Sequence, residues 1–228
     1  RAEERWTFAV DAEHDLGKAV RVPSTVHAVV RSRLNRLSPH AFSLLSASAV
    51  LEYQITFDHL CAIANMGDDT ALPALDELIS GRLLIEGTRP GNASVYTFTN
   101  DMLRDVVYTE AGDARRRLFH RRALEVLEAA RDSAAVLAHH AFAAGLSQAA
   151  FRYSLAAGKE ALRISALSES IVHFEHARQI VQEAASEEMP AKLEINDLYM
   201  QLSQVYESGG QTEKVLALQA ERENFLGE

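Results

Sequence analysis

Apolar residues recur at helical spacing along most of the chain. Between residues 22 and 51 they fall three and four positions apart in two runs, separated by Ser38-Pro39. A serine followed by proline favours a helix start, so this pair separates two helices. Thr56 can cap a third helix. A fourth runs from about Asp69 to Ser80, with Gly81 placed to cap its C-terminal end. The pattern therefore predicts four short helices.

Two short runs of strand character follow these helices. They are Leu83-Leu84-Ile85 and Val95-Tyr96-Thr97-Phe98, and Arg89-Pro90-Gly91-Asn92 between them is a turn signal. Several short helices followed by one β-hairpin are typical of a winged-helix domain, here over residues 23 to 100. A further strand pattern, Trp6 to Val10, lies near the N-terminus without an obvious partner.

No strand pattern is found beyond Asn100, and helices are expected to the end of the chain. Two begin near Met102 and Leu118, and five more are expected over residues 134–143, 147–162, 166–184, 190–207 and 211–226. The last four read as two helix pairs, in which small and aromatic residues recur at the spacing of a tetratricopeptide repeat. In the first pair these are Ala157, Gly158 and Ala161, then Ser170, Phe174 and Ala177; in the second they are Leu202, Ser203 and Tyr206, then Val215, Gln219 and Arg222. The expected fold class is mainly α, with a winged-helix-like domain followed by an α-helical tetratricopeptide-like superhelix.

Composition and net charge limit the classes of partner and the cellular compartment that fit this chain. The chain has 228 residues, few glycines and prolines, and a net charge of −9, so nucleic acid is not its default partner. One cysteine, Cys61, excludes an internal disulfide and fits a reducing compartment such as the cytoplasm. No stretch approaches the roughly 18 apolar residues of a membrane span. Because the chain begins with Arg1, we expect it to be part of a longer protein.

Motifs for catalysis are missing from the sequence. Neither Gly17-Lys18 nor Gly158-Lys159 has the spacing or the following hydroxyl residue of a phosphate-binding P-loop. No zinc-protease motif or nucleophile elbow occurs. His139 and His140 are adjacent, so on a helix they point about 100° apart, and His173 with His176 lacks a third ligand. The sequence therefore predicts no enzyme activity, no cofactor and no metal in this chain.

A run of basic residues, RRRLFHRR at 115–122, stands out. Its members are Arg115, Arg116, Arg117, Arg121 and Arg122. Two interpretations stay open. The arginines could bind an acidic surface or a nucleotide phosphate, since the guanidinium fork suits both. They could equally form a solvated helix face with intrahelical ion pairs, because Leu118 and Phe119 show that the segment also packs.

Three segments resemble one family of proteins. They are VPSTVHAVVRSRLNRLSPHAFSLLSASAVL (22–51), YTFTNDMLRDVVYTEAGDARRRLFHRRALEVLEA (96–129) and VLAHHAFAAGLSQAAFRYSLAAGKEAL (136–162). In this order they resemble the region that follows the nucleotide-binding module in STAND-type signal-transduction ATPases. This family includes large LuxR- and MalT-like regulators and ATPases fused to adenylyl cyclases.

The resemblance implies an order of parts. Residues 1–22 would be the tail of an absent nucleotide-binding domain, 23–110 a winged-helix-like domain and 111–228 the tetratricopeptide-like repeats. ATP or ADP would belong to the parent protein rather than to this region. In the family a His-Asp pair after the wing helps to sense phosphate. The matching positions here are Asn100 and Asp101, and Asn cannot carry the charge of a histidine.

The expected function is that of a non-catalytic regulatory and protein-interaction region, in a cytoplasmic multidomain ATPase that regulates transcription. Its partners would be the nucleotide-binding domain of the same chain, and a protein or small effector on the repeats. The alternative is a DNA-binding winged-helix transcription factor fragment. Against it, the helix that would enter the groove carries Asp69, Asp76 and Glu77 and no basic residue.

Overall fold

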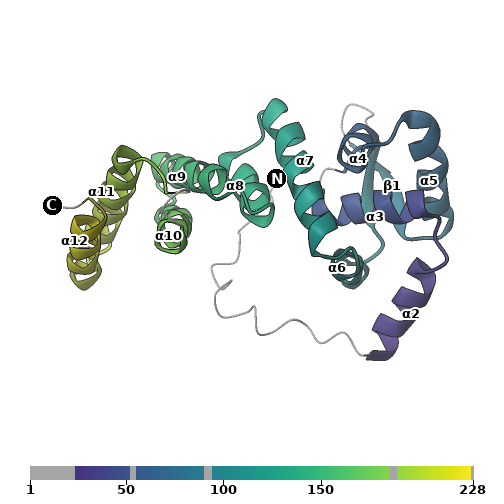
Figure 1. Ribbon diagram of the computed structural model, residues 1–228, viewed down its shortest axis with the longest axis horizontal. Helices are drawn as coiled ribbons and strands as arrows, with labels where there is room; N and C mark the ends of the chain where they lie inside the picture. Colours follow the sequence, from purple (N-terminus) through teal and green to yellow (C-terminus); the bar gives the residue numbers. More distant parts are fainter. Residues whose placement is uncertain (1–23, 52–54, 90–93, 185–188, 227–228) are drawn as a thin grey trace.

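The computed structural model describes residues 24–51, 55–89, 94–184 and 189–226. Within them the protein is mainly α-helical with one two-stranded antiparallel sheet, which confirms the predicted fold class (Figure 1). The predicted tail at 1–22, with its strand pattern at Trp6 to Val10, lies outside the described residues. None of the described helices combines the length and the apolar character needed to cross a membrane.

The first region is built around a helix that is buried on nearly all sides. This helix is α3 (Pro39–Leu51), and nine of its thirteen residues are buried. A helix that is apolar all round is stable only in the centre of a core. The helices α4 (Phe57–Ala64), α5 (Asp68–Ser80) and α6 (Asp101–Glu110) pack on it, and α2 (Ser24–Leu34) packs on α6 (Figure 1). The ion pair between Arg31 and Glu110, at 3.3 Å, joins α2 to α6.

The start of α3 is held by two side chains. The Ser38 hydroxyl accepts a hydrogen bond from the Ala41 amide at 3.1 Å and donates to the Glu77 carboxylate at 2.6 Å. The backbone amide of Ser38 donates to the other oxygen of Glu77 at 2.9 Å. Ser38-Pro39 therefore begins a helix as predicted. Glu77, expected on an outward acidic face of α5, instead fixes α5 to α3.

Gly81 is the C-cap of α5, as predicted, and its amide donates to the Glu77 carbonyl at 2.9 Å. Gly81 follows the helix, but its φ of −73° is right-handed, and the left-handed residue is Arg82 with φ of 50°. The amides of Arg82 and Leu83 donate back to Ile79 and Leu78, which closes the helix end. Glycine takes the left-handed conformation most readily, so nothing in the sequence indicated that Arg82 would take it instead of Gly81.

The predicted hairpin is present and slightly longer than expected. β1 (Leu84–Thr88) pairs antiparallel with β2 (Ser94–Phe98), so that Leu84 faces Phe98 and Thr88 faces Ser94. Ile55 adds an isolated bridge to Tyr96, whose amide donates to the Ile55 carbonyl at 2.8 Å. Part of the predicted turn, residues 90–92, lies outside the described residues. The helices α3 to α5 followed by this hairpin have the element order expected for residues 23–100.

The rest of the chain forms an elongated arm of helices. Its members are α8 (Ala134–Ala143), α9 (Ser147–Arg163), α10 (Leu167–Glu183), α11 (Lys192–Ser208) and α12 (Thr212–Leu226). All five lie within two residues of the predicted bounds. Figure 1 shows them side by side, extending away from the first region. Consecutive helices pack on each other throughout the arm.

The two helix pairs of the arm pack differently. In the first pair Gly158 of α9 lies directly against the buried ring of Phe174 in α10, as the repeat spacing predicts. In the second pair α12 buries Val215 and Leu218, while Gln219 is exposed. The inward face of α12 therefore uses Leu218 rather than the predicted position 219.

Candidate functional site

One helix, α7 (Asp113–Ala129), contacts both regions of the molecule. It packs on α3 and α4 of the first region and on α8 of the arm (Figure 1). Its buried residues are Phe119, His120, Ala123, Leu124 and Leu127. The apolar ones among them, all except His120, belong to a single core that runs from α2 to α12. The predicted domain boundary after residue 110 thus falls next to a helix shared by the two regions.

Three of the five predicted interaction arginines are engaged within the protein. Arg115 lies over the ring of Phe42 at 5.2 Å, and Arg122 donates to the backbone carbonyl of Ile63 at 2.9 Å. Arg116 pairs with Asp113 one turn earlier and lies over the ring of Tyr108 at 4.9 Å. These contacts fix α7 to α3, α4 and α6. The Arg116–Asp113 pair is an intrahelical ion pair of the kind that the second interpretation expected, whereas neither interpretation predicted the contacts of Arg115 and Arg122 with other helices.

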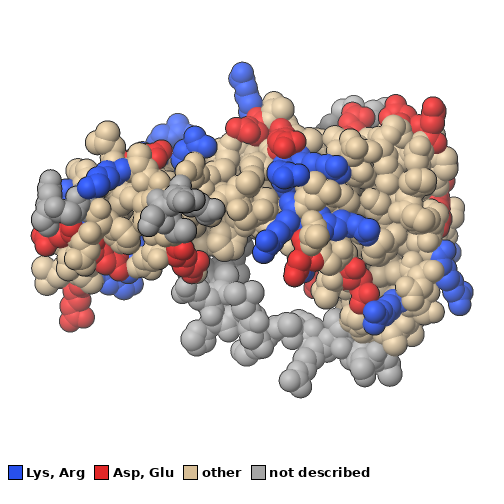
Figure 2. Space-filling view, viewed as in Figure 1, with Lys and Arg blue, Asp and Glu red and all other residues tan. Residues whose placement is uncertain are grey.

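The other two arginines face solvent. Arg117 and Arg121 are both exposed and lie four residues apart, so they share one side of α7. Neither makes a hydrogen bond or ion pair within the part of the chain that the structure describes. Figure 2 shows basic side chains gathered in the middle of the molecule, over α7. This pair is the part of the basic run that remains available to a partner, and we call it the arginine pair.

The predicted nucleotide-sensing position lies at the beginning of α6. The Asn100 side chain accepts a hydrogen bond from the Leu103 amide at 2.8 Å and is thereby the N-cap of this helix. Asp101 follows in the first turn, where a carboxylate favours the positive end of the helix. Both residues are exposed. Among the described residues no hydrogen bond or ion pair joins either one to the arginines of α7. The geometry gives Asn100 a structural role and leaves its nucleotide role untested.

A cluster of three histidines lies where α7 meets α8. His120 of α7 faces His139 and His140 of α8, and we call these residues the histidine cluster. The Nδ1 atoms of His120 and His140 are 2.9 Å apart, and the Tyr108 hydroxyl of α6 lies 2.9 Å from the Nε2 atom of His120. His120 and His140 are almost fully buried, whereas His139 is partly exposed.

Burial keeps two of the three histidines, His120 and His140, uncharged near neutral pH. Desolvation, and then the neighbouring His139, lower the pKa of both His120 and His140 to about 3. The positive charge of Arg116 further lowers the pKa of His120. The two imidazoles are therefore neutral near pH 7. One ring nitrogen of such a pair can donate to the other, which satisfies both groups in the core.

This cluster was not predicted from the sequence. His120 appeared there only as part of the basic run, and His139 and His140 were assessed as neighbours on one helix. The missing information was the packing of α7 on α8, which brings together residues 20 positions apart. Histidine at a buried position of the α7 apolar stripe, beside Phe119 and Ala123, was the available signal. The pair His173 and His176 gains no third ligand among the described residues.

A polar network joins the two helix pairs of the arm. Arg178 of α10 pairs with Glu175 on its own helix and with Glu221 of α12. From α11, the Tyr199 hydroxyl donates to Glu221 and the Tyr206 hydroxyl to Glu175. Hydrogen bonds from Arg178 hold the pKa of Glu221 below its usual range. The network is partly buried and fixes how the pairs sit against each other.

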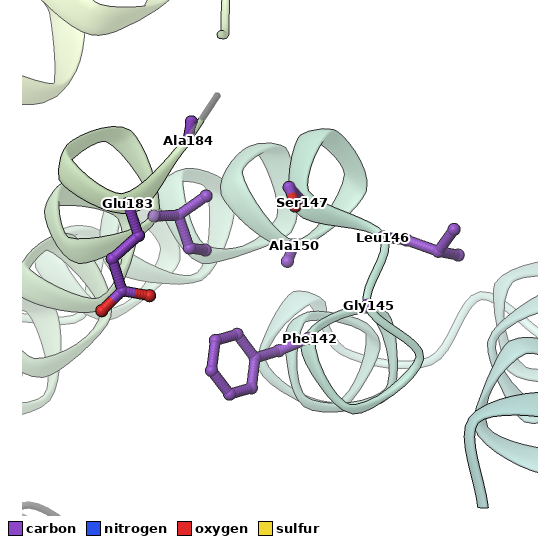
Figure 3. Close-up of a pocket in the computed structure, with 8 residues that line it drawn as sticks. Phe142, Gly145, Leu146, Ser147, Ala150, Glu183 and Ala184 are labelled. Atoms are coloured by element: carbon purple, nitrogen blue, oxygen red, sulfur yellow. The ribbon is translucent and has the colours of Figure 1, made fainter. Parts of the chain in front are cut away.

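A shallow apolar hollow lies at the turn between α8 and α9. It measures about 180 Å³ and includes Phe142, Leu146 and Ile180, with Glu183 at its edge. Phe142 is 46% exposed, and its ring lies 5.0 Å from that of His176. Figure 3 shows Phe142 pointing toward the side of α10 that carries Glu183, while Leu146 points away. This hollow is open to solvent, and its larger apolar side chains come from α8, the turn after it and α10.

The helix that would enter a DNA groove is acidic on its outer side. Asp68, Asp69 and Asp76 of α5 are exposed, and α5 contains no lysine or arginine. Three carboxylates facing a phosphate backbone oppose its binding.

Comparison with known proteins supplies no functional name. No family model matches the chain, and no solved structure matches it. The chain is 31% identical over 160 residues to "Uncharacterized protein R02095" of Rhizobium meliloti (strain 1021). The match covers 68% of this chain but only 15% of that protein. The similar stretch is therefore a small part of a much longer relative.

Proposed function

We propose that this chain is the non-catalytic regulatory and protein-interaction region of a multidomain signal-transduction ATPase that regulates transcription. The observation that supports this most is the position of α7, which packs on α3 and α4 on one side and on α8 on the other. A rigid helix shared by two regions can pass a displacement from one to the other. The same helix presents the arginine pair to solvent, where another domain can reach it.

The partner of the arginine pair is the nucleotide-binding domain of the same protein. Arg117 and Arg121 offer two guanidinium groups on one helix face, and such groups bind carboxylates or phosphates through paired hydrogen bonds. ATP or ADP is bound by that domain and not by this chain. A cytoplasmic location follows from the proposal, because the parent requires ATP. The length of the Rhizobium relative is compatible with such a multidomain setting.

The arm is the second interaction surface. Stacked helix pairs provide an extended face for a protein partner. The hollow beside Phe142 and Ile180 suits a small apolar effector. In this proposal an effector on the arm and a nucleotide on the neighbouring domain influence each other through α7.

Charge reversal of the arginine pair in the full-length parent tests the proposal. Arg117→Glu combined with Arg121→Glu removes the basic face while leaving the three engaged arginines intact. We expect ADP affinity to change by about 5- to 150-fold, the usual range of coupling between sites. Arg152→Glu with Arg163→Glu is the matched control, because these exposed arginines lie on α9. The two double variants are compared by calorimetric titration with ADP.

Equal ADP affinity in the wild type and in both double variants would contradict a role of the arginine pair in nucleotide coupling. The 228-residue chain alone should hydrolyse no ATP, and hydrolysis that persists through repurification would contradict the non-catalytic assignment.

A further inference from the structure

We infer that His120, His139 and His140 form a binding site for one divalent transition-metal ion, such as zinc, between α7 and α8. The three rings contact one another pairwise, with centroids 5.1, 5.3 and 5.6 Å apart. One nitrogen from each ring lies within 4.8 Å of the other two. This triangular arrangement comes from two helices, so it does not arise from local sequence alone. The inference does not depend on the proposed function.

The spacing of the Nδ1 atoms of His120 and His140 is close to what zinc needs. Zn–N bonds of about 2.0–2.1 Å in a tetrahedral site place the ligand nitrogens about 3.3 Å apart. The Nδ1 atoms of His120 and His140, at 2.9 Å, need to separate by a few tenths of an ångström. The ligand nitrogen of His139 lies within 4.8 Å of the other two and has to move closer to them, and this ring is partly exposed. Imidazole nitrogens are ligands that suit zinc, copper and nickel.

The surroundings prepare His120 as a ligand. A metal-bound histidine normally donates its second ring N–H to an oxygen, which fixes its orientation. The Tyr108 hydroxyl lies 2.9 Å from the Nε2 atom of His120 and can accept that bond. The Nδ1 lone pair is then directed to His140 and to the proposed site. The hydrogen bond between the two Nδ1 atoms needs a proton on one of them, so an ion bound through both displaces it, and that ring carries its proton on Nε2 instead.

One neighbouring charge opposes a cation. Arg116 lies over the Tyr108 ring, and its positive charge affects His120. Its ion pair with Asp113 offsets part of that charge. The cluster supplies three ligands, so a tetrahedral ion takes its fourth from solvent or from a bound molecule. His139 at the surface gives the ion a route of entry. A bound ion would tie α7 directly to α8, at the base of the arm.

Metal titration of the chain tests this inference. The protein is stripped with a chelator, dialysed and titrated with Zn²⁺ by calorimetry and with Co²⁺ by visible absorption. We expect one ion per chain and Co²⁺ bands of tetrahedral intensity. His139→Ala should lower the affinity for either ion at least tenfold. His139 is the variant of choice because it is partly exposed, so its loss leaves the core intact. Circular dichroism checks this.

A control separates this site from adventitious binding to surface histidines. His40→Ala removes an exposed histidine of α3 and should leave affinity and stoichiometry unchanged. If wild type and His139→Ala bind Zn²⁺ equally, or if the wild type binds none, the inference is overturned. The contact between His120 and His140 then serves only as a buried hydrogen bond, continued by Tyr108.

Discussion

Gly158 is the point where α9 and α10 come closest. A Cβ atom placed on this residue would lie 2.4 Å from two carbons of the Phe174 ring, well inside van der Waals contact. The ring is fully buried and has little room to move. Glycine is thus required at position 158 by the packing of a partner 16 residues away, not by the backbone conformation of the helix.

Gly158→Ala should therefore destabilise the protein. In an exposed helix the same change stabilises by about 1 kcal/mol. Here overpacking against Phe174 should lower the free energy of unfolding by about 1–3 kcal/mol, and Gly158→Leu should cost at least as much. Phe174→Ala should cost about 3–5 kcal/mol through the cavity that it leaves. Urea denaturation measures each variant.

Two further variants test whether the clash with Phe174 causes the loss of stability in Gly158→Ala. In the Phe174→Ala background, Gly158→Ala should be neutral or stabilising, because the clash is gone. Glu160→Ala, an exposed change on the same helix, should stay within about 0.5 kcal/mol of the wild type. A stabilising Gly158→Ala in the wild-type background would show that the two helices are not packed as described.

The contact between Ser38 and Glu77 predicts a dependence on pH. Hydrogen bonds from the hydroxyl and the amide of Ser38 lower the pKa of Glu77 below its ordinary value of about 4.5. The folded protein therefore binds this proton less readily than the unfolded chain does. The resulting stabilisation is present above about pH 4.5 and is lost as the pH falls through the folded pKa.

Glu77→Gln tests this dependence. The variant should be less stable than the wild type at pH 7, and the difference should shrink toward pH 3. Asp76→Asn, an exposed neighbour on α5, serves as the control and should show a smaller change. A difference between wild type and Glu77→Gln that is constant from pH 7 to pH 3 would contradict the stabilising role of the carboxylate. Chemical denaturation at several pH values provides the measurement.

At the scale of the elements, the helix α6 depends on its first residue. Asn100→Ala removes the hydrogen bond to the Leu103 amide and should cost about 1 kcal/mol. Asn100→Asp keeps an acceptor at the N-cap and should stay close to the wild type. Thermal denaturation distinguishes the two, and equal losses would rule out capping as the role of Asn100. Asn100→His loses the cap, so any nucleotide effect of that change has to be corrected for stability.

The helices could be predicted from the sequence because their signals are local. The apolar spacing of three and four, the caps at Ser38 and Thr56, and the breaks between runs all act within one turn of helix. The predictions that were wrong concern details that depend on contacts between residues far apart in the sequence. Leu218 packs inward in place of position 219, and which side of α12 faces the other helices is not set by a local pattern.

The functional residues were harder to predict for the same reason. The basic run could be recognised, but the division between three engaged arginines and the arginine pair depends on Phe42, Ile63 and Tyr108, which belong to other helices. The histidine cluster likewise requires the packing of α7 on α8. Composition identified the residue types, and tertiary structure decided which of them meet.

At the scale of the molecule, the two regions should behave as one unit around α7. The helix contains five arginines, each a potential trypsin site, yet its apolar face is buried against α3, α4 and α8. Native helices resist proteases, because cleavage needs local unfolding. Brief trypsin digestion should therefore leave residues 101–129 uncut, whereas the urea-unfolded chain is cut there. Mass spectrometry identifies the fragments, and early cleavage inside α7 would contradict the shared packing.

The polar network around Arg178 limits how the helices of the arm can move relative to one another. A slip of α10 by one turn along α11 and α12 would separate Arg178 from Glu221 and leave both charges partly buried without a partner. The ion pair and hydrogen bonds between Arg178 and Glu221 therefore resist a change in how α10 sits against α12. Each of the longer helices, at 17 residues, is about 25 Å long. Because of the contact between Arg178 and Glu221, a molecule bound at α12 would keep its position relative to α10.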